Sequence, residues 1–386
     1  MTGHRHQGLW RRVASGRPLA VTGLGALIVV LIVWTRAPAE PTPVPPALPQ
    51  PANLETPPEP VTPPETEIPE TESPETRTTE TIPPAPPEPA LIAETPQPDP
   101  LDETAARQQV LQTCERIAAR LGSVSLEDCT DSKLGLSGGQ SSQGTPILLA
   151  EYSPVAERQP LGRVLLFGGI HGDELSSVSI VFGWLETLDR FHSGLFHWRI
   201  APLINPDGLL RSKPQRMNDR GVDLNRNFPS PDWKIEASDY WIRRTSRNPR
   251  RYPGEAPLSE PESLWLHGQI ETFQPAAIVA VHAPLHVLDY DGPPDPPERL
   301  GPLHLKQMGT YPGSLGRFAG VHLGLPVVTL ELPSAGIMPT AADQHRVWID
   351  LVAWLRRNVP QHEAVRMARA VSSKPPAAAA AAGLQR

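Results

Sequence analysis

The sequence predicts an α/β fold, in which helices pack on the faces of a largely parallel or mixed sheet. Short, continuous apolar runs occur at ILLAEY, RVLLFGG, WRIAPLI, AIVAVHA and VVTLELP, and such runs are typical of strands that are buried on both faces. Helical or irregular segments such as ELSSVSIVFGWLETLDRF separate the runs. Strands that alternate with helices in this way predict helices layered on a sheet.

An uncharged apolar stretch, Leu19–Trp34, follows a basic segment at 1–18. Its length is slightly short for a membrane-spanning helix, but tryptophan and arginine side chains flank it as they flank spans at a membrane interface. The arginines on its amino-terminal side predict that segment 1–18 stays in the cytoplasm and that the chain after the anchor is exported. A cleaved signal peptide is the alternative, with the sequence APA at 37–39 as a poor cleavage site.

Residues 35–102 form a region rich in proline, threonine and glutamate. Of the 49 prolines in the chain, 22 lie between Pro38 and Pro100, and the region has no apolar periodicity. Such a composition predicts an extended, disordered linker. The formal net charge of −7 owes much to this linker, and no basic stripe of the kind that binds nucleic acid is present, so we expect no nucleic-acid partner.

The folded domain is expected at 103–367. It opens with a helix at TAARQQVLQTCERIAARLG, and its last helix covers HRVWIDLVAWLRRNV. The alanine-rich stretch 368–386 is expected to be a disordered tail. The two cysteines, Cys114 and Cys129, are candidates for a disulfide in an exported protein, and the alternative is a pair of buried thiols.

Several of the predicted strands end in residues that are unusual for a core. His171 and Glu174 follow RVLLFGG in GGIHGDELSS, His282 ends AIVAVHA, and Glu331 interrupts the apolar run VVTLELP. Two imidazoles and a carboxylate are a ligand set that gives a catalytic zinc three protein ligands and an open position for water. A buried Glu331 beside that water would act as a general base. Taken alone, a histidine beside glycines in a turn, such as His171, is more often an ordinary loop residue.

The stretch QRMNDRGVDLNRNFP adds arginines and a carboxylate to these candidates. Guanidinium groups near a metal are expected where an anionic group of the substrate is held, because they stay charged and bind carboxylates in a bidentate way. Asp223 is a candidate to orient a ligand histidine through its second ring nitrogen.

Taken in order, HGDE, NPDG, RxNxxGVDLNRNFP, HAP and TLELP resemble the motifs of the zinc carboxypeptidase superfamily, and in particular its murein peptide amidase A branch. The resemblance covers roughly residues 145–360. It implies a mixed, mostly parallel eight-stranded sheet between helices and an enzyme that uses one zinc ion.

The resemblance also implies roles for individual residues. His171, Glu174 and His282 match the zinc ligands, and Glu331 matches the general base and acid. Arg216 matches the arginine that polarises the scissile carbonyl, and Asn225 and Arg226 match the pair that holds the substrate's carboxylate. Asp223 matches the partner of the first histidine, and Tyr311 matches a tyrosine that closes over the substrate.

For function, the resemblance implies hydrolysis of the amide bond between γ-D-glutamate and meso-diaminopimelate in bacterial cell-wall peptides. The alternatives are a metallocarboxypeptidase that removes L-amino acids from ordinary peptides and a non-catalytic wall-binding module. The expected partners are a peptidoglycan stem peptide or its fragments and the inner membrane. We expect a single-pass inner-membrane protein with its catalytic domain in the periplasm, or a periplasmic protein after signal cleavage.

Overall fold

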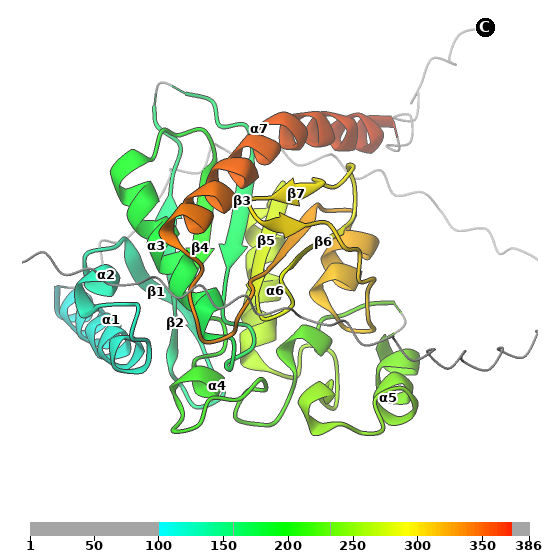
Figure 1. Ribbon diagram of the computed structural model, residues 1–386, viewed down its shortest axis with the longest axis horizontal. Coiled ribbons are helices and arrows are strands. Elements are labelled where there is room, and N and C mark those ends of the chain that lie inside the picture. The colour runs from blue at the N-terminus through cyan, green and yellow to red at the C-terminus, as the bar shows by residue number, and fades with distance from the viewer. Residues whose placement is uncertain (1–99, 157, 232, 373–386) are drawn as a thin grey trace, which may run out of the picture. The chain divides into compact units, whose positions relative to one another are not determined.

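The computed structural model describes residues 100–156, 158–231 and 233–372 (Figure 1). The expected anchor at 19–34, all but the last three residues of the linker and most of the expected tail lie outside this part of the chain. No helix within the described ranges is both long enough and apolar enough to span a membrane. The last helix continues through Pro360 to Ser372, beyond the end that the sequence predicts for it.

A seven-stranded mixed sheet forms the centre of the domain, in the order β1-β2-β4-β3-β5-β9-β6. The inner strands β4, β3, β5 and β9 run parallel, whereas the pairs β1–β2, β2–β4 and β6–β9 are antiparallel. The strands are β1 Leu134–Gln140, β2 Pro146–Tyr152, β3 Arg163–Phe167, β4 His197–Ala201, β5 Ala277–His282, β6 Val287–Asp291 and β9 Val327–Glu331.

The expectation of eight strands with mostly parallel pairing is wrong in both respects for the described residues. Within this sheet three pairs are parallel and three are antiparallel, because β2 runs against β4 and the edge strands β1 and β6 also run against their neighbours. Beside β6, Leu305 makes a single parallel bridge to Leu288. That segment instead folds back on itself as a two-stranded sheet, β7 (Arg299–Leu300) with β8 (Leu303–His304).

Helices cover both faces of the sheet. Because side chains alternate along a strand, Val164 and Leu166 of β3 face one core, which α1, α3 and α7 complete, while Leu165 and Phe167 face a second core built with α6 and η3. Figure 1 shows α3 and α7 crossing one side of the sheet. The helices are α1 Pro100–Arg120, α2 Leu126–Thr130, α3 Leu175–Phe191, α4 Pro206–Leu210, α5 Trp233–Arg243, α6 Pro261–Phe273 and α7 Ala341–Ser372, with the 3-10 turns η1 Leu224–Arg226 and η2 Pro249–Arg251 and the π-helix η3 Gly316–His322.

A disulfide joins the first two helices. Cys114 of α1 and Cys129 of α2 are bonded to each other, and both are fully buried in the first core. Ser125 caps α2, since its hydroxyl accepts the backbone N–H of Asp128 at 3.0 Å. The bond therefore ties a short helix, which could not be stable alone, to the longer α1.

Candidate metal centre

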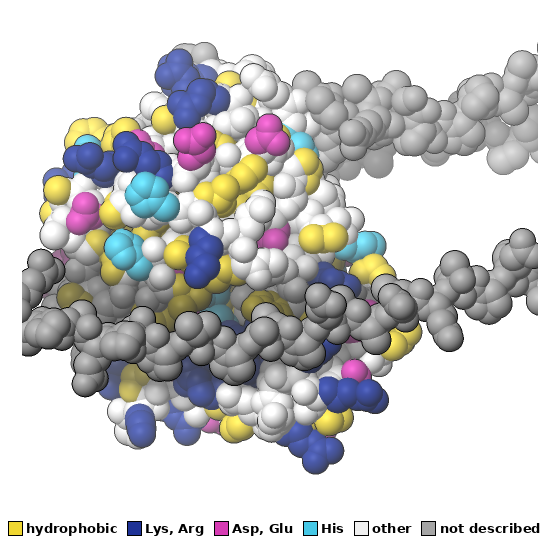
Figure 2. Space-filling model, turned by 45° about the vertical axis from the view of Figure 1, so that its right-hand side comes forward, with side chains coloured by type: hydrophobic (Ala, Val, Ile, Leu, Met, Phe, Trp, Pro, Cys, Tyr) yellow, Lys and Arg dark blue, Asp and Glu magenta, His cyan; other side chains and the backbone are white. Residues whose placement is uncertain are grey.

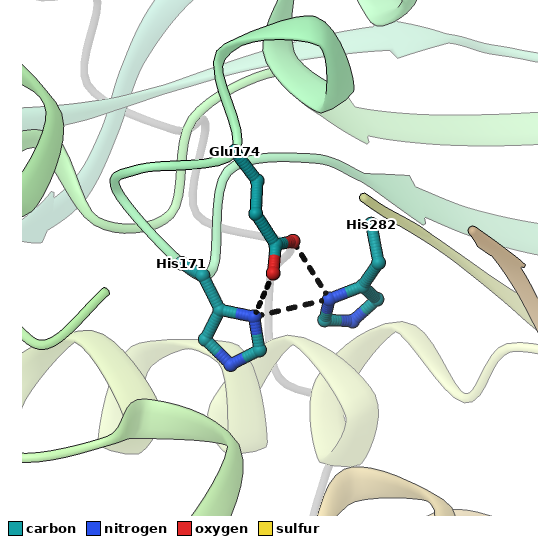
Figure 3. Close-up of side chains that lie close together, drawn as sticks. All are labelled: His171, Glu174 and His282. Carbon is teal, nitrogen blue, oxygen red and sulfur yellow. Dashed lines mark hydrogen bonds and ion pairs between the residues drawn. The ribbon is translucent and has the colours of Figure 1, made fainter. Parts of the chain in front are cut away.

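Three buried side chains meet where β3 and β5 end (Figure 3). His171 lies in the turn after β3, Glu174 is the residue before α3, and His282 is the last residue of β5. His171 Nδ1 lies 2.8 Å from Glu174 Oε1, His282 Nδ1 lies 3.1 Å from Glu174 Oε2, and the two Nδ1 atoms are 3.2 Å apart. Because strands β3 and β5 are parallel, their carboxyl ends deliver these residues to one edge of the sheet.

This donor set fits a divalent cation. The two Nδ1 atoms face each other and the carboxylate, and a single proton cannot satisfy all three groups. Burial opposes the charge of Glu174, but the charges of His171 and His282 outweigh it and hold the pKa of this carboxyl below its usual range. Burial likewise disfavours charge on His282, but Glu174 raises the pKa of its imidazole. Two imidazoles and one carboxylate in this arrangement can hold a zinc ion with a fourth position left open.

Asp223 orients the first histidine. Its Oδ1 lies 3.2 Å from His171 Nε2, so that nitrogen carries the proton and Nδ1 presents its lone pair to the metal position. Asp223 is fully buried, and it also accepts the backbone N–H of Asn225 at 3.1 Å. Although burial opposes its charge, Arg216 and His171 hold the pKa of the Asp223 carboxyl well below its usual range.

Arg216 connects Asp223 to the ligand cluster. Its Nε donates to Asp223 Oδ2 at 2.9 Å, and its Nη1 lies 3.1 Å from His171 Nδ1 and 3.6 Å from Glu174 Oε1. The guanidinium is thus buried directly beside the metal position and is fixed by a carboxylate on its far side.

Glu331 is the last residue of β9 and the register partner of His282. Its Oε2 accepts the backbone N–H of Leu285 at 3.4 Å. Burial raises the pKa of the Glu331 carboxyl, in spite of the nearby His282. It therefore lies next to the ligand cluster without belonging to it.

Arg226 and Tyr311 form a second part of the site. The Arg226 guanidinium carbon lies 4.4 Å from the centre of the Tyr311 ring, and burial lowers the pKa of Arg226 to about 10. Within the described residues its Nε is buried without a hydrogen-bond partner. Asn225 lies beside it, and its side-chain oxygen accepts the backbone N–H of Leu315 at 2.8 Å.

All these groups except Asp223 line one pocket of about 370 Å³. Phe167, Ala280 and Val327 of the second core also line it, so the pocket lies on the α6 side of the sheet. The structure adds wall residues that the sequence analysis did not single out, namely Arg250, Arg251, Asp289 and Asp291. The two arginines lie in the short turn η2 and the two aspartates in the short strand β6, where charged side chains are usually solvated.

The NPDG motif, residues 205–208, does not line the pocket but packs against the turns that carry His171 and Arg216. Asn205 accepts the Gly208 N–H at 2.8 Å and donates to the backbone oxygen of Arg216 at 3.1 Å. Asp207 binds the hydroxyl group of Ser141 at 2.7 Å. A side chain on Gly172 would collide with the backbone of Gly208, so the HGDE and NPDG turns pack backbone against backbone.

The sequence of this chain matches a known protein family and known relatives. The sequence model of the zinc carboxypeptidase family matches residues 134–291. The chain is 34% identical over 202 residues to murein peptide amidase A of Escherichia coli. This alignment covers 50% of this chain and 79% of that protein. It is 33% identical over 212 residues to murein peptide amidase A of Vibrio campbellii, and this alignment covers 53% of this chain and 79% of that protein. The crystal structure of murein-tripeptide amidase MpaA from Escherichia coli O157 aligns with a TM-score of 0.41 and 30% identity, covering 56% of this chain and 90% of that one.

The chain belongs to the zinc carboxypeptidase family, and it is an enzyme of the zinc metallopeptidase type. Within that family it belongs to the murein peptide amidase A branch. Zinc is the metal of the family, and the cluster of His171, Glu174 and His282 could hold one such ion.

Proposed function

We propose that this protein hydrolyses an amide bond of bacterial cell-wall peptides, namely the bond between γ-D-glutamate and meso-diaminopimelate. The observation that carries the proposal is the likeness to murein peptide amidase A over 79% of that protein's length. The three metal-binding side chains support it, because all of them fall within the residues that match the zinc carboxypeptidase family.

In this proposal His171, Glu174 and His282 hold the zinc ion. When it is bound, zinc polarises a carbonyl group and makes water acidic enough to attack near neutral pH. Glu331, next to this position, takes the proton of the attacking water and later delivers it to the leaving nitrogen. Its raised pKa suits a group that must both accept and return a proton.

Arg216 is placed to stabilise the negative charge that develops on the carbonyl oxygen. Its guanidinium borders the ligand cluster and lines the pocket, and Asp223 fixes its orientation through Nε. A preorganised cation in a site with little water is effective for this purpose, because it needs no reorganisation during the reaction.

The basic side of the pocket suits a substrate that carries carboxylates. Arg226 and Asn225 are placed to hold one carboxylate of the released residue, because Arg226 is buried and its Nε is unpaired. Arg250 and Arg251 line the same pocket. Basic side chains gather on the lower part of the face in Figure 2, at the end of the molecule where Figure 1 places α5.

The proposal includes the place of action. The segment at 19–34 would anchor the chain in the inner membrane, with the catalytic domain in the periplasm. The disulfide between Cys114 and Cys129 supports this, since such bonds persist in oxidising compartments. A fusion of alkaline phosphatase to the carboxyl terminus should be active in intact cells, and an inactive fusion would contradict export.

The test of function uses the purified full chain with zinc. It is offered L-Ala-γ-D-Glu-meso-diaminopimelate and, separately, an ordinary L-peptide with a free carboxyl terminus, and the products are identified by mass spectrometry. Release of diaminopimelate alone supports the proposal. Release of L-amino acids from the ordinary peptide alone would make the protein a carboxypeptidase instead, and a Glu331→Gln sample controls for contaminating peptidases.

A further inference from the structure

The pocket beside the metal centre has an acidic end. Asp289 and Asp291 of β6 line it, and along a strand side chains two residues apart share one face. Their register partners on β9 are Thr329 and Val327, which also line the pocket, so this end of the pocket is formed by adjoining strands.

The strand register sets the distance of these carboxylates from the reaction centre. Val287 pairs with Glu331, so Asp289 and Asp291 are two and four residues further along β6. At roughly 3.3 Å per residue, they lie about 7 Å and about 13 Å from Glu331 along the strand. A long aliphatic side chain with a polar group at its end spans a comparable distance.

Neither carboxylate is neutralised by the protein. In the parts of the chain that the structure describes, no lysine, arginine or histidine forms an ion pair with Asp289 or Asp291. Asp289 is 5% exposed and accepts one hydrogen bond, from the backbone N–H of Met308 at 2.9 Å. Burial and the neighbouring charge of Asp289 raise the pKa of Asp291 to about 6, so the protein itself provides no cation that would favour its ionised form.

The same pocket is also lined by Arg226, whose Nη1 donates a hydrogen bond to the backbone oxygen of Asn225. Arg226 is 6% exposed, and its Nε has no hydrogen-bond partner in the described ranges. A pocket lined by a buried guanidinium whose Nε has no partner and by unneutralised carboxylates is complementary to a molecule that carries both an anionic and a cationic group.

We infer that Asp289 and Asp291 determine substrate specificity by binding a cationic group at the far end of the released residue's side chain, while Arg226 holds its carboxylate. This rests on the proposed function, in which the released residue is diaminopimelate, whose side chain ends in a carbon that carries a free ammonium group and a second carboxylate. Glycine at position 316 keeps the acidic end open, because a Cβ there would collide with Asp291 Oδ2. Arg317, the next residue, is instead directed to Glu236, with 3.4 Å between Nη2 and Oε2.

The test compares two γ-D-glutamyl substrates that differ only in the distal amine. One ends in meso-diaminopimelate and the other in L-2-aminopimelate, which lacks that amine. The wild-type full chain should have a kcat/KM about 10-fold to 100-fold higher for the first. Asp291→Asn and Asp289→Asn should each reduce kcat/KM for diaminopimelate and change it by less than about threefold for aminopimelate.

Two further variants separate charge recognition from damage to the fold. Gly316→Ala should push Asp291 aside and reproduce the selective loss without removing a charge. Asp295→Asn removes an exposed carboxylate four residues after Asp291, outside the pocket lining, and should leave both rates unchanged. The melting temperature and zinc content of each variant are measured to establish that it is folded.

The outcomes distinguish this inference from the proposed function. Equal hydrolysis of both γ-glutamyl substrates, or equal losses on both in Asp291→Asn, would overturn the inference and leave the function intact. If neither is cleaved, the function fails, and the same variants are tested on ordinary peptides that end in lysine or norleucine. A preference for lysine that depends on Asp291 then supports the inference, and no preference overturns it.

Discussion

His282 and Glu331 are register partners at the carboxyl ends of the parallel strands β5 and β9. A metal ligand and the candidate general base are therefore neighbours because of backbone pairing, without a side-chain hydrogen bond between them. The sheet fixes the spacing of the two groups, which is the kind of rigid support that a catalytic constellation needs.

Replacing Glu331 should separate catalysis from metal binding. Glu331→Gln keeps the shape of the side chain but cannot accept a proton, so we expect kcat to fall by about 10²-fold to 10⁴-fold. Zinc content should stay at one ion, because Glu331 is outside the ligand cluster. Metal analysis and steady-state kinetics on the same sample test this, with exposed Glu298→Gln as the control. Wild-type turnover in Glu331→Gln would remove its catalytic role.

Asp223 should affect zinc affinity through His171. Asp223→Asn keeps a hydrogen-bond acceptor for Arg216 but weakens the interaction that fixes His171 with Nδ1 free. Loss of such a partner typically costs about 10-fold to 100-fold in metal affinity. Competition with a chelator of known affinity measures it, and Asp219→Asn, at an exposed position nearby, is the control. An unchanged zinc affinity would show that Asp223 does not position this ligand.

Zinc should also stabilise the fold. An ion that binds only the folded state adds about 2.7 kcal/mol at a concentration 100 times its Kd. The melting temperature should therefore rise with zinc in the wild type and stay constant in His282→Asn, which loses one of the ligands. A zinc-dependent rise of the same size in this variant would place the ion elsewhere.

Asp291 should make stability depend on pH. Its pKa is raised from 3.8 to about 6, so between these values the unfolded chain releases this proton more readily than the folded protein. Ionising the buried Asp291 therefore lowers the free energy of unfolding. This loss of stability is absent below about pH 4 and complete above about pH 6. Asp291→Asn should then be more stable than the wild type at pH 7.5, by on the order of 1 kcal/mol after solvent screening, with the difference vanishing near pH 4. Urea unfolding of both proteins at pH 7.5 and pH 4 measures this difference in stability. A stability gain of Asp291→Asn that is larger at pH 4 than at pH 7.5 would contradict the prediction.

The disulfide should contribute to stability and not to turnover. It closes a loop with a sequence separation of 15 residues, for which the chain-entropy account gives about 3 kcal/mol. Neither Cys114 nor Cys129 lines the pocket. Replacing both with serine should lower the unfolding free energy by this order while kcat/KM stays within about twofold. A fall in kcat/KM of more than about twofold, measured at a temperature where the variant is folded, would show that the disulfide also contributes to turnover.

The sequence predicted the interior of the sheet better than its edges. The five apolar runs all contain strands, and the runs of β3, β5 and β9 are continuously hydrophobic because these strands are buried on both faces. The edge strand β1 was missed because LGLSGGQ contains three glycines, which are typical of turns. Strand β6 was missed because VLDYD has too few residues to establish an alternation and carries two carboxylates.

The metal cluster could be predicted because each of its members ends or follows a parallel strand, and such ends meet at one edge of the sheet. His286, the rival to His282, is exposed and lies outside the cluster. The acidic end of the pocket could not be predicted in this way. Whether Asp289 and Asp291 face the pocket or solvent depends on the register between β6 and β9, which spacing along the chain does not specify.

The backbone contact between Gly172 and Gly208 has a consequence for how this enzyme can vary. Neither glycine lines the pocket, yet any side chain at position 172 would push the loop that carries His171 and Glu174 away from its support. In a scan of all single substitutions both positions should be as intolerant as the ligands. New substrate preferences would therefore arise by changes around Gly316 and Asp291, where the wall consists of side chains that can be exchanged without moving the ligand loop.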